Sequence, residues 1–262
     1  MTKSEKYHQL IADVREDYLH RTAEQTVGGP KLLWCEDCKR EINLWTYWQN
    51  SLDARIMLVG QDWGCPWDDG SEETMRRIRD VNDGTGRPFF PDCNDNVVWT
   101  TDRNLGALFH ILGYDIWQKQ PDLFFTNLVL GYRDHGTSGP FRQKWIRDDP
   151  PYFKRLAEII EPEVMICLGK STFEGVIYAL TGQMKRIKGF NRFLDSGDNY
   201  QDITLDSGRT ARVYAVAHCG TIGTMNRNRG DQRPAQKISS ADISRQAEDW
   251  DRIRIGLSKE AR

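Results

Sequence analysis

Three polar side chains suited to catalysis each stand directly after a short apolar run of the chain. The carboxylate Asp62 follows the run that ends at Gly60, whereas the amide Asn127 and the imidazole His218 close two later runs. A carboxylate stabilises a cation or accepts a proton, and an imidazole donates a hydrogen bond near neutral pH. An amide carries donors and an acceptor together, so it reads the polar edge of a ligand. The three types together suit a hydrolytic site if the fold gathers them in one cleft.

The order of apolar runs and helical periodicities predicts an α/β fold that gathers them. Four runs indicate buried strands, at residues 54–60, 122–129, 163–169 and 212–217. Helical spacing predicts helices at residues 4–24, 104–112, 151–160, 171–180 and 240–257. Ser171 is expected to cap the fourth helix, and Ser239 or Ser240 the last. This alternation implies three layers around a central, mostly parallel four-stranded sheet, in which ligands bind at the carboxyl ends of the strands.

Length and composition restrict the class of protein. The 262 residues contain no internal repeat and no clear linker, so we expect a single domain over residues 1–262. The 9 Trp, 9 Tyr and 10 Phe exclude a disordered class. No apolar run is long enough to span a bilayer, and the first ten residues lack the apolar stretch of a secretory signal. We therefore expect a cytoplasmic protein without membrane contact, whose six cysteines are reduced.

The net charge of −2 conceals two opposed segments. Residues 209–262 hold 11 Lys and Arg against 6 Asp and Glu, whereas residues 1–208 hold 25 against 32. The C-terminal segment is thus positive by 5 charges, and the rest is negative by 7. A locally basic segment permits contact with phosphates, although a solvated charged face explains such a bias equally well.

Five short motifs in a fixed order resemble the uracil-DNA glycosylase superfamily. They read Val59-Gly60-Gln61-Asp62, Thr85-Gly86-Arg87-Pro88-Phe89, Phe125-Thr126-Asn127-Leu128-Val129, Glu161-Pro162-Glu163-Val164-Met165-Ile166-Cys167-Leu168-Gly169 and Val216-Ala217-His218. Each motif is degenerate, but together they extend from about residue 35 to residue 230. The resemblance implies a uracil-DNA glycosylase-like fold and a monofunctional DNA glycosylase, which extrudes a pyrimidine and hydrolyses its N-glycosidic bond. A non-catalytic DNA- or protein-binding module on this fold is the alternative from another class.

The resemblance also implies a role for each matched residue. Asp62 and His218 are the expected catalytic pair: Asp62 stabilises the sugar cation and orients water, and His218 donates a hydrogen bond to the base O2. Asn127 reads the edge of the base, and Gln61 holds the base or the flanking phosphate. Phe89 is expected to stack on the extruded base, with Phe90 as its competitor. Helix capping, turn capping and ordinary core packing remain the structural alternatives for these side chains.

Two departures from the family pattern bear on the substrate. Trp63 stands where Pro is usual, and Gly64 stands where a Tyr excludes pyrimidines substituted at C5 in the best-known branch. An open wall at Gly64 favours a C5-modified base, such as glucosylated hydroxymethylcytosine removed in defence against phage. Ordinary uracil removal in base-excision repair is the alternative, because the iron–sulfur branch of the superfamily also has Gly there.

The family's DNA-facing loop corresponds to residues 225–229, where Arg227, Asn228 and Arg229 are the expected DNA contacts. Cys35 and Cys38 take the place of the first two ligands of the family's iron–sulfur cluster. No Cys lies between residues 94 and 166, so such a cluster is not supported. Zinc bound with Cys65 or Cys93 remains an alternative to two reduced thiols. The expected chemistry itself requires no cofactor.

Overall fold

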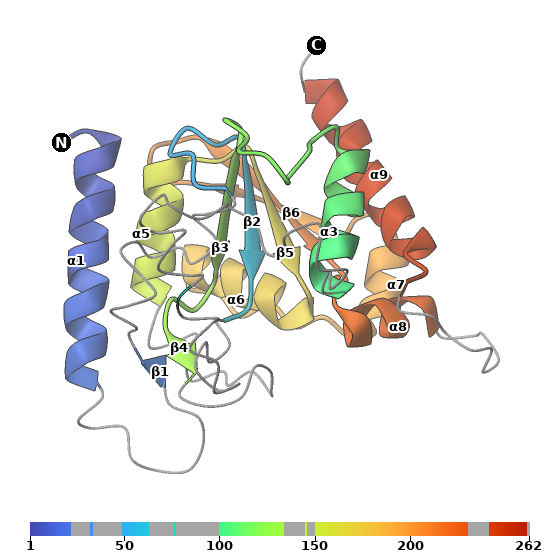
Figure 1. The fold of residues 1–262 in the computed structure, drawn as a ribbon, viewed down its shortest axis with the longest axis horizontal. Helices are drawn as coiled ribbons and strands as arrows, with labels where there is room; N and C mark the ends of the chain where they lie inside the picture. Colours follow the sequence, from blue (N-terminus) through green and yellow to red (C-terminus); the bar gives the residue numbers. More distant parts are fainter. Residues whose placement is uncertain are drawn as a thin grey trace.

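The computed structural model describes residues 1–21, 32–33, 49–62, 76, 100–133, 145, 150–229 and 241–260. Its centre is a five-stranded sheet with the order β3-β2-β5-β7-β6 (Figure 1). The strands are β3 (Leu123–Asn127), β2 (Ile56–Gly60), β5 (Val164–Leu168), β7 (Thr210–Val216) and β6 (Tyr200–Thr204). The first four are mutually parallel, and β6 pairs antiparallel with β7. A separate two-stranded pair joins β1 (Leu32–Leu33) to β4 (Tyr132–Arg133).

The four strands predicted from the sequence are confirmed, but the predicted count of four is wrong. The additional strand β6 lies at the edge of the sheet, and only one of its five residues, Ile203, is buried. A half-exposed polar strand gives no apolar run, so sequence patterning does not detect it. Arg212 on β7 holds Asp202 on β6 through two hydrogen bonds of 2.7 and 3.0 Å.

Helices cover both faces of the sheet, because successive strand residues point to opposite sides. Met57 and Val59 face a core shared with α1 (Lys3–Arg21), α5 (Pro150–Ile160) and α6 (Lys170–Thr181). Ile56 and Leu58 face a second core shared with α3 (Thr100–Ile111) and α9 (Ser244–Glu260). Figure 1 shows these two helical groups on either side of the strands.

The predicted helices are confirmed in place, with changes at their ends. Helix α6 begins at Lys170, and its N-cap is Gly169 at φ 100° without a side-chain cap, so Ser171 as the cap is wrong. In α9 the carboxylate of Asp242 accepts a 3.1 Å hydrogen bond from the Ser244 amide; Ser239 and Ser240 lie outside the described residues. Within the described part of the chain, no helix has the length and apolarity needed to cross a membrane.

Two helices were not expected. Helix α7 (Phe190–Asp195) precedes β6, and helix α8 (Thr221–Arg229) follows β7. The predicted DNA-facing loop at residues 225–229 is therefore the second half of α8. Sequence periodicity missed this helix because only Thr224, Arg227 and Asn228 are buried in it, and all three are polar.

Candidate functional site

The carboxyl edge of the parallel strands carries the residues that the sequence singled out. Gly60 and Asn127 are register partners at the ends of β2 and β3, and Asp62 follows β2 by two residues. His218 follows the end of β7 by two residues. Strand β5 lies between β2, which leads to Asp62, and β7, which leads to His218. At the usual strand spacing, β2 and β7 are therefore about 10 Å apart. Asp62, Asn127 and His218 therefore lie at the same edge of the sheet, and their convergence in one cleft stays a prediction.

Asp62 is held in place by two neighbours. Its Oδ2 forms an ion pair with the Nε of Arg133 in β4, and its Oδ1 accepts a 3.0 Å hydrogen bond from the Gln61 side chain. The Arg133 and Asp62 side chains are only 3% and 7% exposed. The Arg133 guanidinium also lies 4.9 Å from the ring centroid of Trp145. This fixes the carboxylate and commits the Gln61 amide to Asp62 in this structure, whereas a base or phosphate was the expected partner.

Asn127 is buried at 2% exposure, and its carboxamide lies directly against Gly60. A Cβ built on Gly60 would approach the Asn127 Oδ1 to 2.0 Å, which is far inside contact distance. Gly60 is therefore required by the side chain beside it, and not by a turn of the backbone. The two residues together place an amide at the end of β3, where it has both donor and acceptor capacity.

His218 has a defined hydrogen-bonding state. Its Nδ1 accepts a 2.9 Å hydrogen bond from the Gly220 amide, so in the neutral ring the proton lies on Nε2. His218 is exposed at the surface. The protein around its imidazole nevertheless removes part of the solvent and lowers the pKa of the ring, which favours the neutral form. His218 thus presents an Nε2–H donor without carrying a positive charge.

Two buried amides that the sequence analysis missed hold the backbone around His218. Asn104 of α3 donates to the Cys219 carbonyl at 2.9 Å and to the Thr224 hydroxyl at 3.3 Å. Gln246 of α9 donates to the carbonyls of Ala217 and His218, at 3.2 and 3.1 Å. Asn104 is 2% exposed and Gln246 is 0% exposed. A buried polar residue in an amphipathic helix indicates such a role, but the sequence alone does not show that these two are buried.

A buried carboxyl group, Asp102, lies in the first turn of α3 and is 8% exposed. Burial raises its pKa to about 7. Its negative form also contributes, after burial itself, to raising the pKa of the nearby Cys219 thiol to about 12. Cys167 and Cys219 are both free and buried, so neither thiol is reactive in the folded protein.

The structure corrects the expected role of α8. Arg227 is 2% exposed and forms two hydrogen bonds of 2.7 Å with Asp249, together with a 2.8 Å ion pair to Asp195. Asn228 is also buried and donates to the Asp242 carbonyl. Neither side chain is available to phosphates here, because both fasten α8 to its neighbours. Of the three predicted DNA contacts, only Arg229 is exposed.

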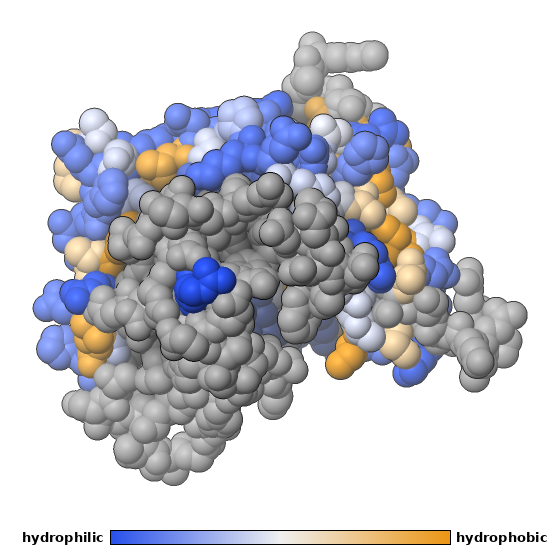
Figure 2. Space-filling model, in the orientation of Figure 1, coloured by the Kyte–Doolittle hydropathy of each residue, from blue (hydrophilic) through white to orange (hydrophobic). Residues whose placement is uncertain are grey.

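An exposed apolar residue stands at the start of the same helix. Ile222 lies four residues after His218 and is 74% exposed. Helix α8 approaches the strand end closely, since a Cβ on Gly223 would lie 2.1 Å from the His218 carbonyl oxygen. Among the described residues, Met1 is the one large hydrophobic residue that is more exposed than Ile222. The described part of the face in Figure 2 carries orange patches among blue, hydrophilic residues. The sequence analysis did not select Ile222, because apolarity alone predicts burial.

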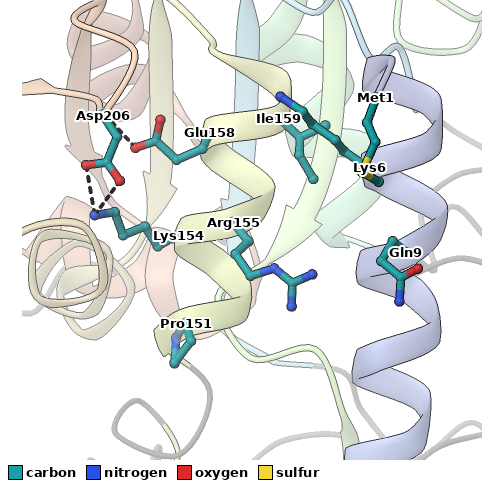
Figure 3. A pocket seen from close by; sticks show the side chains of 9 residues that line it. All are labelled: Met1, Lys6, Gln9, Pro151, Lys154, Arg155, Glu158, Ile159 and Asp206. Atoms are coloured by element: carbon teal, nitrogen blue, oxygen red, sulfur yellow. Dashed lines mark hydrogen bonds and ion pairs between the residues drawn. The ribbon is translucent and has the colours of Figure 1, made fainter.

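The predicted residues Gly64, Phe89, Cys35 and Cys38 lie outside the described residues, as do Trp63, Phe90, Cys65 and Cys93. The described residues contain no group of three or more His, Cys, Asp or Glu arranged to hold a metal ion. A cavity of about 610 Å³ lies between α1 and α5 and is lined by Lys6, Arg155 and Glu158 among others (Figure 3). None of the predicted site residues lines this cavity.

No family model and no curated protein sequence matches this chain.

Proposed function

We propose that the chain is a monofunctional DNA glycosylase that hydrolyses the N-glycosidic bond of a flipped pyrimidine and leaves an abasic site. The observation that carries the proposal is the arrival of a fixed carboxylate, a buried amide and an imidazole whose Nδ1 accepts a hydrogen bond, at one edge of a parallel sheet. The described residues of this group are Asp62, Asn127 and His218, and their strands are in parallel register. His218 and Asp62 are suited to the hydrolysis itself, and Asn127 is suited to recognising the base.

The leaving base takes the electron pair of the bond to the sugar, so negative charge develops on its ring and O2. The Nε2–H of His218 is suited to donate to that oxygen. A neutral donor polarises the base without needing a proton supply. Loss of one such hydrogen-bond donor commonly lowers the rate on the order of 10²–10³-fold.

The sugar is left as an oxocarbenium-like cation, which a nearby anion stabilises. Asp62 supplies that charge in a site where 7% of its side chain is exposed. Arg133 and Gln61 each occupy one carboxylate oxygen, and a carboxylate has about four acceptor positions, so acceptor capacity remains for the attacking water. Water adds its oxygen to the anomeric carbon and releases its proton to Asp62 or to solvent. The paired guanidinium of Arg133 holds the carboxylate in position for this electrostatic role.

Extrusion of a base leaves a gap in the duplex, and an apolar wedge commonly fills such a gap. Ile222 is exposed and lies four residues beyond His218, in the first turn of α8. Its position supports the insertion of this side chain into the stack while the base occupies the pocket. Asn127 then reads the polar edge of the extruded pyrimidine, and Phe89 is the proposed stacking partner.

We favour a C5-modified pyrimidine, such as glucosylated hydroxymethylcytosine in phage DNA, because Gly64 stands where the best-known branch of the resembling superfamily carries a Tyr. Uracil is the alternative substrate. The test is alkali-dependent strand cleavage, with mass spectrometry of the released base, on uracil-containing and on glucosylated hydroxymethylcytosine DNA. We expect release of the modified base, and its loss in Asp62→Ala and His218→Ala. Release of uracil alone contradicts the modified-base substrate, whereas no release from either DNA by the folded protein favours a binding module.

A further inference from the structure

We infer that an exposed basic strip beside helix α8 holds the DNA backbone next to the flipped base; this rests on the proposed function. The basic strip consists of Arg186, Lys188, Arg192 and Arg229, all of which are exposed. Residues 183–192 contain four positive charges, Lys185 included, and no acidic residue. The strip replaces the contacts that Arg227 and Asn228, which are buried, cannot provide in this structure.

The strip is fixed at the same edge of the sheet as the candidate site. The Ile187 amide donates a 2.6 Å hydrogen bond to Glu174, which lies in the second turn of α6, close to the end of β5. The side chain of Asn191 in α7 donates to the Asn226 carbonyl of α8 at 3.1 Å. The first bond fastens the connection between α6 and α7 to α6, and the second fastens α7 to the helix that carries Ile222.

The charges of the strip have no acidic partner among the described residues. Nearby acids are engaged elsewhere: Asp195 pairs with Arg227 and Arg245, at 2.8 and 2.9 Å. Glu174 accepts the Ile187 amide and lies 3.8 Å from Lys170. Asp198, beyond α7, is the remaining exposed acid of this stretch. A row of unneutralised cations is what the phosphates of a polyanion require.

Distance along α8 relates the strip to the extruded base. Ile222 and Arg229 are seven residues apart in this helix, which corresponds to about 10 Å at the helical rise. One strand of DNA advances about 3.4 Å per nucleotide along the axis, so Arg229 would meet phosphates roughly three nucleotides from the wedge. The bond from Asn191 to Asn226 holds the rest of the strip beside the same helix, on the side of the duplex that Ile222 enters.

The test measures binding to an unmodified 20-bp DNA duplex at increasing salt, by fluorescence anisotropy, which needs no base release. The variant Arg186→Gln/Lys188→Gln/Arg192→Gln removes three charges of the strip. The control Lys6→Gln/Lys119→Gln/Arg254→Gln removes three exposed charges elsewhere. Each neutralised phosphate contributes about 0.9 to the slope of log affinity against log salt. We expect the first variant to lower this slope by about 2 to 3, and the control to keep it.

Equal slopes for the strip variant and the unchanged protein, or equal losses in both triple variants, would overturn the inference. Its failure is separable from failure of the proposed function. Base release with an unchanged slope rejects the strip alone. A reduced slope in a protein that releases no base keeps the strip as a DNA-binding surface and rejects the glycosylase.

Discussion

The side-chain oxygen of Asn127 fills the space in which a Cβ on Gly60 would have to lie, only 2.0 Å from it. The ends of β2 and β3 are thus fitted to one another by a glycine and an amide in register. This contact couples the backbone that leads into Asp62 to the residue proposed to read the base.

Gly60→Ala is expected to destabilise the protein by about 1–3 kcal/mol, because it overpacks a buried contact. The same substitution in an Asn127→Ala background should cost much less, since the clashing amide is then absent. Urea unfolding of the two single variants and the double variant measures this coupling. Additive costs would show that Gly60 is required for a reason other than Asn127.

His218 should remain neutral, with its proton on Nε2, at pH values below 6.5. The Gly220 amide occupies Nδ1, and desolvation lowers the pKa of the ring. Base release that needs this neutral donor should persist as the pH falls through 6.5 and decline only at lower pH. Nitrogen chemical shifts of the ring and a pH profile of base release test this together. A rate that falls with a midpoint at or above pH 6.5 would contradict it.

Asp102→Asn is expected to stabilise the protein at pH 8 and to have little effect at pH 4. The pKa of Asp102 is raised from 3.8 to about 7, so the folded state holds a proton that the unfolded state has lost. Stability therefore falls as the pH rises from about 4 to 7, by on the order of 4 kcal/mol at most. Asn imitates the protonated acid and removes this dependence. The control is Asp53→Asn, since the Asp53 side chain is 88% exposed; equal pH profiles of unfolding for wild type and Asp102→Asn would contradict the assignment.

Asn104→Ala should lower the turnover number more than it changes substrate binding. The substitution removes the Asn104 donor from the Cys219 carbonyl, which keeps only the 3.2 Å hydrogen bond from the Thr224 hydroxyl, at a cost of about 0.5–1.5 kcal/mol. A displacement of the His218 turn by about 1 Å is enough to lower a rate by up to 10²-fold. Single-turnover rates and DNA affinity are measured in parallel, with the Nε2 proton of His218 as an NMR readout. A stable variant with an unaltered rate would remove Asn104 from the positioning of His218.

Ile222→Ala should leave stability within about 0.5 kcal/mol, because the side chain is 74% exposed. If Ile222 acts as a wedge, base release from duplex DNA falls about 10-fold, while release from single-stranded DNA is unchanged. The matched control is Ile255→Ala in α9, where the side chain is 41% exposed. Equal losses on duplex and single-stranded DNA would argue against the wedge.

The sheet was predictable because its parallel strands are buried on both faces and appear as continuous apolar runs. The residues at β2, β3, β5 and β7 are almost all buried, as such runs require. The edge strand β6 and helix α8 were not predictable, since their burial pattern involves polar side chains with partners distant in sequence. Arg227 illustrates the difficulty: sequence shows a basic residue near a basic terminus, and only the fold supplies Asp249 and Asp195.

The candidate site was partly predictable for a related reason. Asp62, Asn127 and His218 follow strands, and strand order in a parallel sheet fixes their common edge. Arg133, Asn104 and Gln246 act through contacts with residues 28 to 115 positions away, and no local pattern encodes those pairs.

The buried pairing of Arg227 with Asp249 has a consequence for how this sequence can change over time. Arg227 also pairs with Asp195, and Asp249 also pairs with Arg252. Loss of one partner therefore leaves the other buried charge with a single, more exposed counter-ion, which is destabilising. Replacement of both by apolar residues of similar volume is tolerated far better. Homologues of this chain should therefore carry both residues or neither. Positions 227 and 249 should change together wherever α8 packs on α9 as it does here.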